Sequence, residues 1–384
     1  MGRGATTEPR RRLPFFALFI ALSIVAAAGI GVTVSNRLAG AAQPAVSDPH
    51  PVVTTTVAQP LQFVSSFPAS GAADISSNSA ITLTFSLPIS PSSPMPVLSP
   101  AVQGTWNQSQ PETLTFTPTQ SFVPFTKEVV TVPAGDSGIV SSSGQYLQSS
   151  LSIPFTIAPG SVLRLQQLLA ELGYLPLNFV PQDAQAIPAG QMAIPQAGSF
   201  SWKWLNLPQP LTSLWSPGAY NVMTKGAVMQ FENQVGLAAD GIAGPEVWSH
   251  LLAAVAGGKT NSAPYDYVTV TKALPQHVTV YSNGQVAFVT LANTGVSAAQ
   301  TVNGTFPVYL RFKSTTMKGT NPNGTTYDDH NVPWVSYFNG SQGLHGFVRA
   351  GYGYPQSDGC VEMPVASAAK VWPLTPIGTL VTVG

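Results

Sequence analysis

The spacing of apolar residues changes twice along this chain, and each change predicts a different kind of domain. In residues 61–158, apolar and polar residues alternate in short runs such as Ile81–Phe85, Thr113–Thr117, Val129–Val132 and Ser152–Ile157. Alternation with period two is typical of half-buried strands, and Pro, Gly and Ser residues separate the runs as turns. The pattern predicts a small antiparallel β-sandwich. A stabilising disulfide is excluded because the chain contains one cysteine.

Between residues 160 and 256 the apolar residues recur at helical spacing. The first run is Val162–Leu172, and Gly173 after it is a typical helix stop. Later runs at Ala227–Val235 and Val247–Leu252 complete a predicted small helical bundle.

The segment 175–219 interrupts this bundle and contains Trp202, Trp204 and Trp215. A connection this long without regular structure is normally functional or disordered, whereas three tryptophans predict packing. Two interpretations stay open. The tryptophans contact a sugar or a neighbouring domain, or they form a small core that covers the insertion itself.

Strand patterns return after a second linker at Gly257–Ala263. Predicted strands lie at Val268–Val270, His277–Tyr281, Val286–Leu291, Val308–Phe312 and Leu380–Val383. Asn283-Gly284 between two of them predicts a tight hairpin turn.

The N-terminus has the composition of a membrane segment. Residues 1–12 contain four arginines and one acid, and Leu13–Val34 is an uncharged apolar run. At about 1.5 Å per residue this run spans roughly 33 Å, enough to cross a bilayer. The arginines predict a cytoplasmic tail at 1–12, a transmembrane anchor at 13–34, a linker at 35–60 and later domains outside the cytoplasm. A signal peptide cleaved near Leu38–Ala42, giving a secreted protein, is the alternative.

The remaining composition narrows the function. Charged residues make up 8% of the chain and the net charge is zero, against about 25% charged in an average soluble protein. With no basic run outside the N-terminus, nucleic acid is not an expected partner. Apolar residues make up 44%, enough for packed cores. We expect a monomer with a surface of Ser, Thr, Asn and Gln, which suits an extracytoplasmic protein.

The surroundings of Cys360, the only cysteine, favour a nucleophile. His345 lies fifteen residues upstream (360 − 345) and Gly359 directly precedes the cysteine. Only the thiolate attacks carbonyls well, and a thiol with a pKa of about 8.5 needs a base beside it. Gly359 leaves room for a substrate, and backbone N–H groups there could form an oxyanion hole. The alternative is that Cys360 is a buried structural residue that packs as a small hydrophobic side chain.

This segment resembles the signature of the L,D-transpeptidases, which have a YkuD-type catalytic domain. The matching residues are His345, Gly346, Ser357, Gly359, Cys360 and Val361. Asp358 and Glu362 depart from it, because the family usually has histidine and arginine there. Upstream, Asn293–Gly295 and Thr301–Phe306 resemble two further family segments, and Pro333, Trp334 and Phe338 resemble its aromatic approach to the His-Gly pair. The resemblance covers residues 265–384 and implies a mostly β domain of mixed sheets with a short helix near 366–372.

For function, the resemblance implies a cell-wall L,D-transpeptidase. Cys360 would attack a tetrapeptide stem and form a thioester, with His345 as base and no metal or organic cofactor. Asp358 is predicted to orient and charge His345 as a third catalytic residue, since residues two apart in an extended chain face the same side. The oxyanion and substrate site is predicted to use Gly359, Ser357, Gly346, Trp334 and Tyr354.

Two further resemblances concern the other domains. Residues 61–158 resemble bacterial Ig-like domains through Phe67–Ala72 and a late Phe-Thr strand. Residues 160–256 resemble a peptidoglycan-binding three-helix domain, through the order of Leu165-Gln166, Leu172–Tyr174, Phe231-Glu232, Leu237, Asp240-Gly241, Gly244 and Trp248. The expected partners are therefore peptidoglycan stem peptides and glycan, and the membrane through residues 13–34.

Rival functions remain. An L,D-carboxypeptidase uses the same residues. A papain-like or amidase-type wall hydrolase places its cysteine before its histidine, unlike this chain. In a non-catalytic wall scaffold, Asp358 and Glu362 would record lost activity.

A metal at Asp328, Asp329 and His330 is disfavoured because adjacent side chains diverge. We interpret that stretch as a loop lining the donor cleft, and His50, His250 and His277 as structural or solvated.

Overall fold

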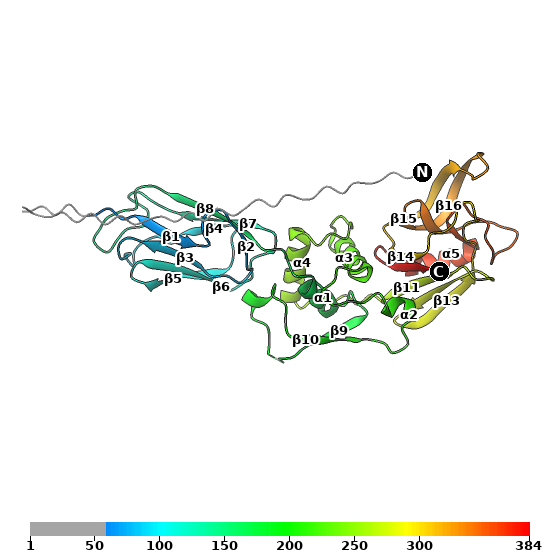
Figure 1. Ribbon diagram of the computed structural model, residues 1–384, viewed down its shortest axis with the longest axis horizontal. Helices are drawn as coiled ribbons and strands as arrows, with labels where there is room; N and C mark the ends of the chain where they lie inside the picture. Colours follow the sequence, from blue (N-terminus) through cyan, green and yellow to red (C-terminus); the bar gives the residue numbers. More distant parts are fainter. Residues whose placement is uncertain (1–58, 184) are drawn as a thin grey trace, which may run out of the picture. The chain divides into compact units, whose positions relative to one another are not determined.

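The computed structural model describes residues 59–183 and 185–384, and these form a mainly β, multidomain structure with a few helices (Figure 1). The predicted tail, anchor and most of the first linker lie outside the described residues and stay predictions. Within the described ranges, no helix has the length and hydropathy needed to cross a bilayer.

The first domain is a sandwich of two four-stranded sheets. Their strand orders are β1-β3-β6-β5 and β2-β8-β7-β4. The strands are β1 Phe63–Phe67, β2 Ala72–Ile75, β3 Ile81–Phe85, β4 Val97–Ser99, β5 Gly104–Gln110, β6 Thr113–Pro118, β7 Lys127–Val132 and β8 Leu151–Ile157. Alternating side chains such as Leu83 and Phe155 fill the core. The prediction of a wholly antiparallel sandwich is wrong in one pair, because β2 and β8 run parallel.

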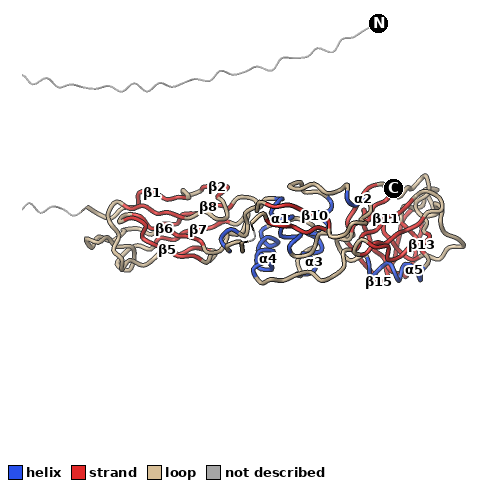
Figure 2. Tube along the Cα trace, turned by 90° about the horizontal axis from the view of Figure 1, so that it is seen from below, coloured by secondary structure: helices blue, strands red, loops and turns tan. Residues whose placement is uncertain are grey.

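Helices gather in the next part of the chain (Figure 2). They are α1 Val162–Glu171, the short α2 Gln209–Thr212, α3 Val222–Val235 and α4 Pro245–Ala256. The Ser161 hydroxyl caps the start of α1, and Gly236 ends α3 in a left-handed conformation with φ 79°.

The insertion 175–219 has regular structure. Strands β9 (Leu177–Pro181) and β10 (Gly198–Trp202) pair antiparallel, with the 3₁₀ turn η1 (Ala189–Gln191) between them. Trp202, Trp204 and Trp215 pack against the buried core of the helical module. Trp215 also meets Phe200 of β10 at 5.1 Å between ring centres. Trp204 also lies against the Asn283-Gly284 turn of the next domain, where a Cβ on Gly284 would come within 2.7 Å of the Trp204 Cβ. The insertion therefore packs on the helical module and also meets a neighbouring domain, so each of the two open interpretations holds in part.

The C-terminal domain contains two mixed sheets. Their orders are β13-β12-β11-β19-β14 and β15-β16-β17-β18. The elements are β11 Asp266–Thr271, β12 His277–Ser282, β13 Gln285–Leu291, β14 Gly304–Pro307, β15 Leu310–Thr320, β16 Thr326–Asn339, β17 Gln342–Gly346, β18 Val361–Met363, α5 Val365–Val371, η2 Trp372–Leu374 and β19 Leu380–Val383. Asn283 and Gly284 form the predicted hairpin turn with φ of 49° and 77°.

The helical module and the C-terminal domain share apolar packing. Tyr265, Tyr267 and Leu380 belong to the same buried cluster as Phe231 and the other core residues of the helices. A Cβ on Gly226 of α3 would lie 2.6 Å from the Gly378 carbonyl oxygen. Because this junction is close-packed, experiments on either part are best made in the full chain.

Asp328–His330 lie in a strand, which corrects the prediction of a loop. They belong to β16, which pairs with β15 in a long hairpin. Alternation along the strand turns Tyr327 and Asp329 toward the cavity described below, whereas Asp328 pairs with Lys318 at 2.9 Å.

Candidate active site

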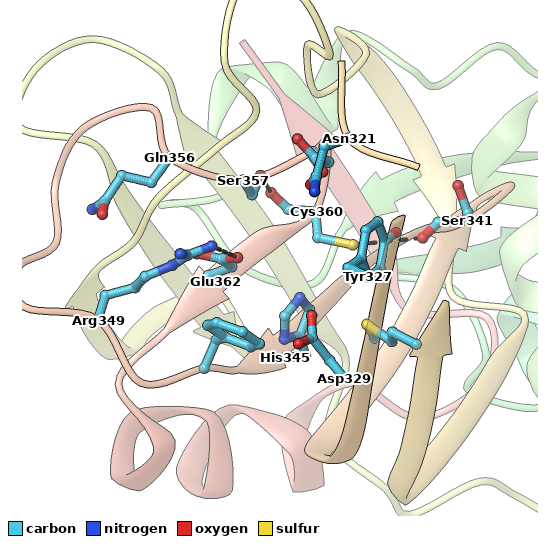
Figure 3. A pocket seen from close by; sticks show the side chains of 13 residues that line it. Asn321, Tyr327, Asp329, Ser341, His345, Arg349, Gln356, Ser357, Cys360 and Glu362 are labelled. Atoms are coloured by element: carbon cyan, nitrogen blue, oxygen red, sulfur yellow. Dashed lines mark hydrogen bonds and ion pairs between the residues drawn. The ribbon is translucent and has the colours of Figure 1, made fainter. Parts of the chain in front are cut away.

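Parallel pairing of two short strands brings His345 and Cys360 together. His345 lies near the end of β17, and Cys360 directly precedes β18, whose Glu362 is in register with His345. This pairing brings His345 and Cys360 close together in space although they are fifteen residues apart in the sequence. Both side chains line one cavity of about 290 Å³ (Figure 3). Its lining residues are Met317, Asn321, Tyr327, Asp329, Ser341, His345, Phe347, Arg349, Gln356, Ser357, Asp358, Cys360 and Glu362.

A network of hydrogen bonds fixes the turn that carries the thiol. The Ser357 hydroxyl donates to the Cys360 carbonyl at 2.6 Å and accepts from the Gly359 N–H at 3.2 Å. The hydroxyl of buried Thr301 donates to the Gly359 carbonyl at 2.9 Å. Gly359 has φ 109°, where a side chain would be strained. The Gly359 N–H is therefore occupied, whereas the Cys360 N–H has no acceptor among the described residues.

His345 is held by the backbone. Its Nδ1 lies 3.1 Å from the Gly346 carbonyl oxygen. Because a carbonyl only accepts, Nδ1 carries the hydrogen and Nε2 is left as the proton acceptor. Burial lowers the pKa of the imidazole below its ordinary value of 6.5. The ring is therefore neutral near pH 7 and competent as a base.

Cys360 also rests in its neutral form. Burial raises the pKa of its thiol to about 11, the Gly343 N–H offsets part of this, and the charges of Glu362 and Asp358 add to it. The sulfur donates to the Ser341 carbonyl at 3.5 Å. Within the described residues, no hydrogen bond joins the sulfur to His345. The two side chains therefore line the same cavity without a direct hydrogen bond between them.

The structure does not bring Asp358 to His345. Asp358 is exposed, and no hydrogen bond joins these two side chains in the described part of the chain. Its charge acts on the pKa of the thiol, whereas the charged residues that act on the pKa of His345 are Glu362, Arg349 and Asp329. The orienting contact predicted for Asp358 is made by the Gly346 carbonyl.

The other predicted substrate residues fall into three groups. Ser357 and Gly359 shape the turn at Cys360. Gly346 is buried, and a Cβ there would come within 3.1 Å of Pro333 and Val365, so it allows α5 to pack closely. Trp334 packs against Trp372 with ring centres 5.7 Å apart, and Tyr354 is 45% exposed. Neither Trp334 nor Tyr354 lines the cavity.

Sequence reasoning missed the ion pair at the other end of the cavity. Arg349 donates through Nε and Nη2 to the carboxylate of Glu362, at 2.8 and 2.7 Å. From the sequence, Glu362 stands out only as a departure from the family pattern. The signal in the sequence is a carboxylate where the family usually has a guanidinium, because a buried carboxylate needs a cation beside it.

Comparison with known families agrees with the three resemblances. Residues 265–383 match the family model of the L,D-transpeptidase catalytic domain (YkuD), residues 57–157 that of the bacterial Ig-like domain, and residues 204–251 that of a peptidoglycan binding domain. This chain therefore contains a region that matches the L,D-transpeptidase catalytic domain (YkuD), together with regions that match an Ig-like domain and a peptidoglycan binding domain.

Solved structures that are similar to this chain include L,D-transpeptidases. One from Mycobacterium smegmatis is 11% identical, with 85% of this chain and 100% of that chain covered and a TM-score of 0.28. L,D-transpeptidase 3 from Mycobacterium tuberculosis is 12% identical over 84% of this chain and 98% of that chain, with a TM-score of 0.30. The catalytic domain of the E. faecium enzyme is 26% identical over 32% of this chain and 100% of that chain, with a TM-score of 0.29. No curated protein matches this chain.

Proposed function

We propose that this protein is a cell-wall L,D-transpeptidase whose acyl carrier is Cys360. The observation that carries the proposal is the cavity shared by Cys360 and a neutral His345 with a free Nε2, inside the domain that matches the family. Such a pair suits general-base activation of a thiol. The chemistry needs neither a metal nor an organic cofactor.

The first half-reaction forms the acyl-enzyme. His345 Nε2 takes the thiol proton as the sulfur attacks the carbonyl of an L-configured stem residue. The Cys360 N–H, which has no acceptor in the described structure, donates to the oxyanion. The C–N bond then breaks, and His345 returns its proton to the amine of the departing D-alanine.

The second half-reaction transfers the acyl group. The amine of a neighbouring stem gives a proton to His345 and attacks the thioester. The C–S bond breaks, a new peptide bond forms, and the sulfur regains its proton. If water replaces the amine, the same enzyme is an L,D-carboxypeptidase.

The accessory parts are proposed to place this site at the wall. Residues 13–34 anchor the chain with its tail, 1–12, in the cytoplasm. Residues 61–158 act as a spacer, and residues 160–256 hold peptidoglycan. The catalytic domain then works outside the cytoplasm, on the cell wall.

Mass spectrometry of muropeptide products tests the proposal. The full chain, incubated with purified tetrapeptide muropeptides, should yield cross-linked dimers that have lost one D-alanine, and Cys360→Ala should yield none. Trimmed monomers alone would assign a carboxypeptidase. Unchanged muropeptides would favour the non-catalytic scaffold and overturn the proposal.

A further inference from the structure

An ion pair places a guanidinium in the wall of the catalytic cavity. Glu362, two residues after Cys360, binds Arg349 side-on through Nε and Nη2. The Glu362 side chain is 6% exposed and that of Arg349 is 31% exposed. Figure 3 shows this pair on one side of Cys360, and Tyr327 and Ser341 on the other. The carboxylate is thus buried, whereas the guanidinium reaches the cavity.

Arg349 is held in place from three directions. Its backbone N–H donates to the Tyr352 hydroxyl at 3.1 Å, and Glu362 holds one edge of its guanidinium. The guanidinium also lies over the ring of Phe347, 4.6 Å from its centre. A side chain fixed in this way loses little conformational freedom when it binds a ligand.

The guanidinium still has donors to offer. Arginine has five N–H groups in a planar fork, and Glu362 takes two of them. Nη1 has no acceptor among the described residues, so the end-on edge formed by Nη1 and Nη2 remains open. That edge fits a second carboxylate with two parallel hydrogen bonds.

The charges in the cavity restrict where a carboxylate can bind. Arg349 is the one Lys or Arg among the residues that line the cavity, and Asp329 and Asp358 line it without a partner in the described structure. A ligand carboxylate is repelled by these two acids and attracted by Arg349. Recognition of a carboxylate in this cavity is therefore expected at Arg349 alone.

We propose that Arg349, positioned by Glu362, binds a free carboxylate of the peptide donor and so selects donors that carry one. The inference rests on the proposed function and specifies the group that the site recognises. In this account Glu362 does not record lost activity. It directs a guanidinium into the cavity from residue 349 instead of from its own position.

The test compares donors that differ by one charge. The full chain is assayed with a free-acid tetrapeptide containing diaminopimelate and with analogues amidated at a single carboxyl group. One analogue is amidated at the C-terminus and another at the side chain of the third residue. The free acid should exceed one of these amides roughly 10- to 100-fold in kcat/KM, as expected for hydrogen bonds between charged groups. The amide that loses activity identifies the carboxyl group that is bound.

The informative variant is Arg349→Gln combined with Glu362→Gln, which removes both charges without leaving a buried carboxylate unpaired. Its acid-to-amide ratio should fall to about one. The ratio is the readout, because the charges of Glu362 and Arg349 also act on the pKa values of the catalytic pair and can change the rates with both donors together. Lys318→Gln, which removes a cation that does not line the cavity, is the matched control and should keep the wild-type ratio. An unchanged ratio in the double variant, or no preference in the wild type, would overturn the inference.

A second measurement separates this inference from the proposed function. Protection of Cys360 from iodoacetamide by the same peptides reports binding without turnover. If the wild type processes no donor, the proposed function fails, yet the free acid should still protect Cys360 at lower concentration than the discriminating amide. The double variant should lose that difference. Equal protection of the wild type by acid and amide would contradict the role of Arg349.

Discussion

The resting state of the Cys360–His345 pair follows from burial. Desolvation disfavours both the thiolate and the imidazolium, so the pair rests as a thiol and a neutral ring. This differs from a preformed ion pair, in which the thiol is already ionised near neutral pH. The two states predict different pH profiles.

We expect the alkylation of Cys360 by iodoacetamide to keep rising above pH 9, because the thiol pKa is raised to about 11. The rate of donor acylation should also increase with pH, but its midpoint should lie below pH 6.5. The reason is that the lowered pKa of His345 keeps the imidazole in its base form down to that midpoint. Iodoacetamide rates and donor acylation rates across pH provide the check. An alkylation rate that is already level below pH 7 would show a preformed thiolate.

Asp358→Asn distinguishes a triad residue from a charge near the thiol. A carboxylate that orients and charges His345 would make acylation fall by at least about tenfold on removal. The structure predicts the opposite sign for the thiol, because the charge of Asp358 raises the pKa of Cys360. Alkylation at pH 8 should therefore quicken in Asp358→Asn, and acylation should not fall.

The control is Asp328→Asn in the β15–β16 hairpin. Asp328 does not line the cavity and pairs with Lys318 instead. This variant should leave both rates unchanged. A tenfold loss of acylation confined to Asp358→Asn would restore the triad role.

At the scale of elements, the sequence revealed strands wherever one face is buried. β3, β6, β8 and β19 follow from alternation or apolar runs because their side chains contribute to a core. The outer half of β16 could not be predicted, since Thr326–Asn331 is largely exposed and is held by backbone pairing with β15. The β9–β10 hairpin was missed because its strands are joined by a long connection without a tight-turn pair.

The same contrast applies to the site. Cys360, His345, Ser357 and Gly359 lie within a local pattern that sequence can show. The contact of Arg349 with Glu362 could not be predicted, because no periodicity relates residues 349 and 362 across an irregular loop. Thr301 reaches the Gly359 carbonyl from 58 residues away in sequence.

The turn between α3 and α4 depends on a buried acid, and this gives the helical module a pH dependence. Glu232 accepts the Gly241 N–H at 2.8 Å, with Tyr220 and Asp240 nearby. Burial raises the pKa of Glu232 from 4.5 to about 7, so the folded state holds this proton more tightly than the unfolded state. The stability that it contributes is complete below pH 4.5 and is lost as the pH rises through about 7.

Hydrogen exchange of α3 and α4 amides in the full chain checks this dependence. Glu232→Gln should remove this pH dependence. The free energy of opening of the variant minus that of the wild type should therefore be about 1–3 kcal/mol larger at pH 8 than at pH 5. Comparison at equal pH cancels intrinsic exchange rates. A constant difference between the two proteins across this range would contradict the account.

At the scale of the whole molecule, the tasks proposed for the domains fall in different parts of the chain. The cavity around Cys360 is lined by residues of the C-terminal domain alone, whereas the peptidoglycan-binding match lies in residues 204–251. Binding to the wall and acyl transfer should therefore be separable, even though the two parts share apolar packing at Tyr267 and Leu380.

Co-sedimentation with insoluble peptidoglycan measures that separation. The full chain with Cys360→Ala should sediment as fully as the wild type, because the helical module and not the thiol is proposed to hold the wall. A full-length chain whose Cys360 has been blocked by a carbapenem should do the same. If either change abolishes sedimentation, the catalytic cavity holds the wall and the helical module is a spacer.

The central claim is that Cys360 carries the acyl group, and intact-protein mass spectrometry with peptide mapping tests it most directly. After incubation with a carbapenem or a tetrapeptide donor, the full chain should gain the mass of one acyl group on the peptide containing Cys360. Cys360→Ala should gain none while keeping the wild-type circular dichroism spectrum. An adduct of equal yield on Cys360→Ala, or no adduct on folded wild type with either reagent, would contradict the account.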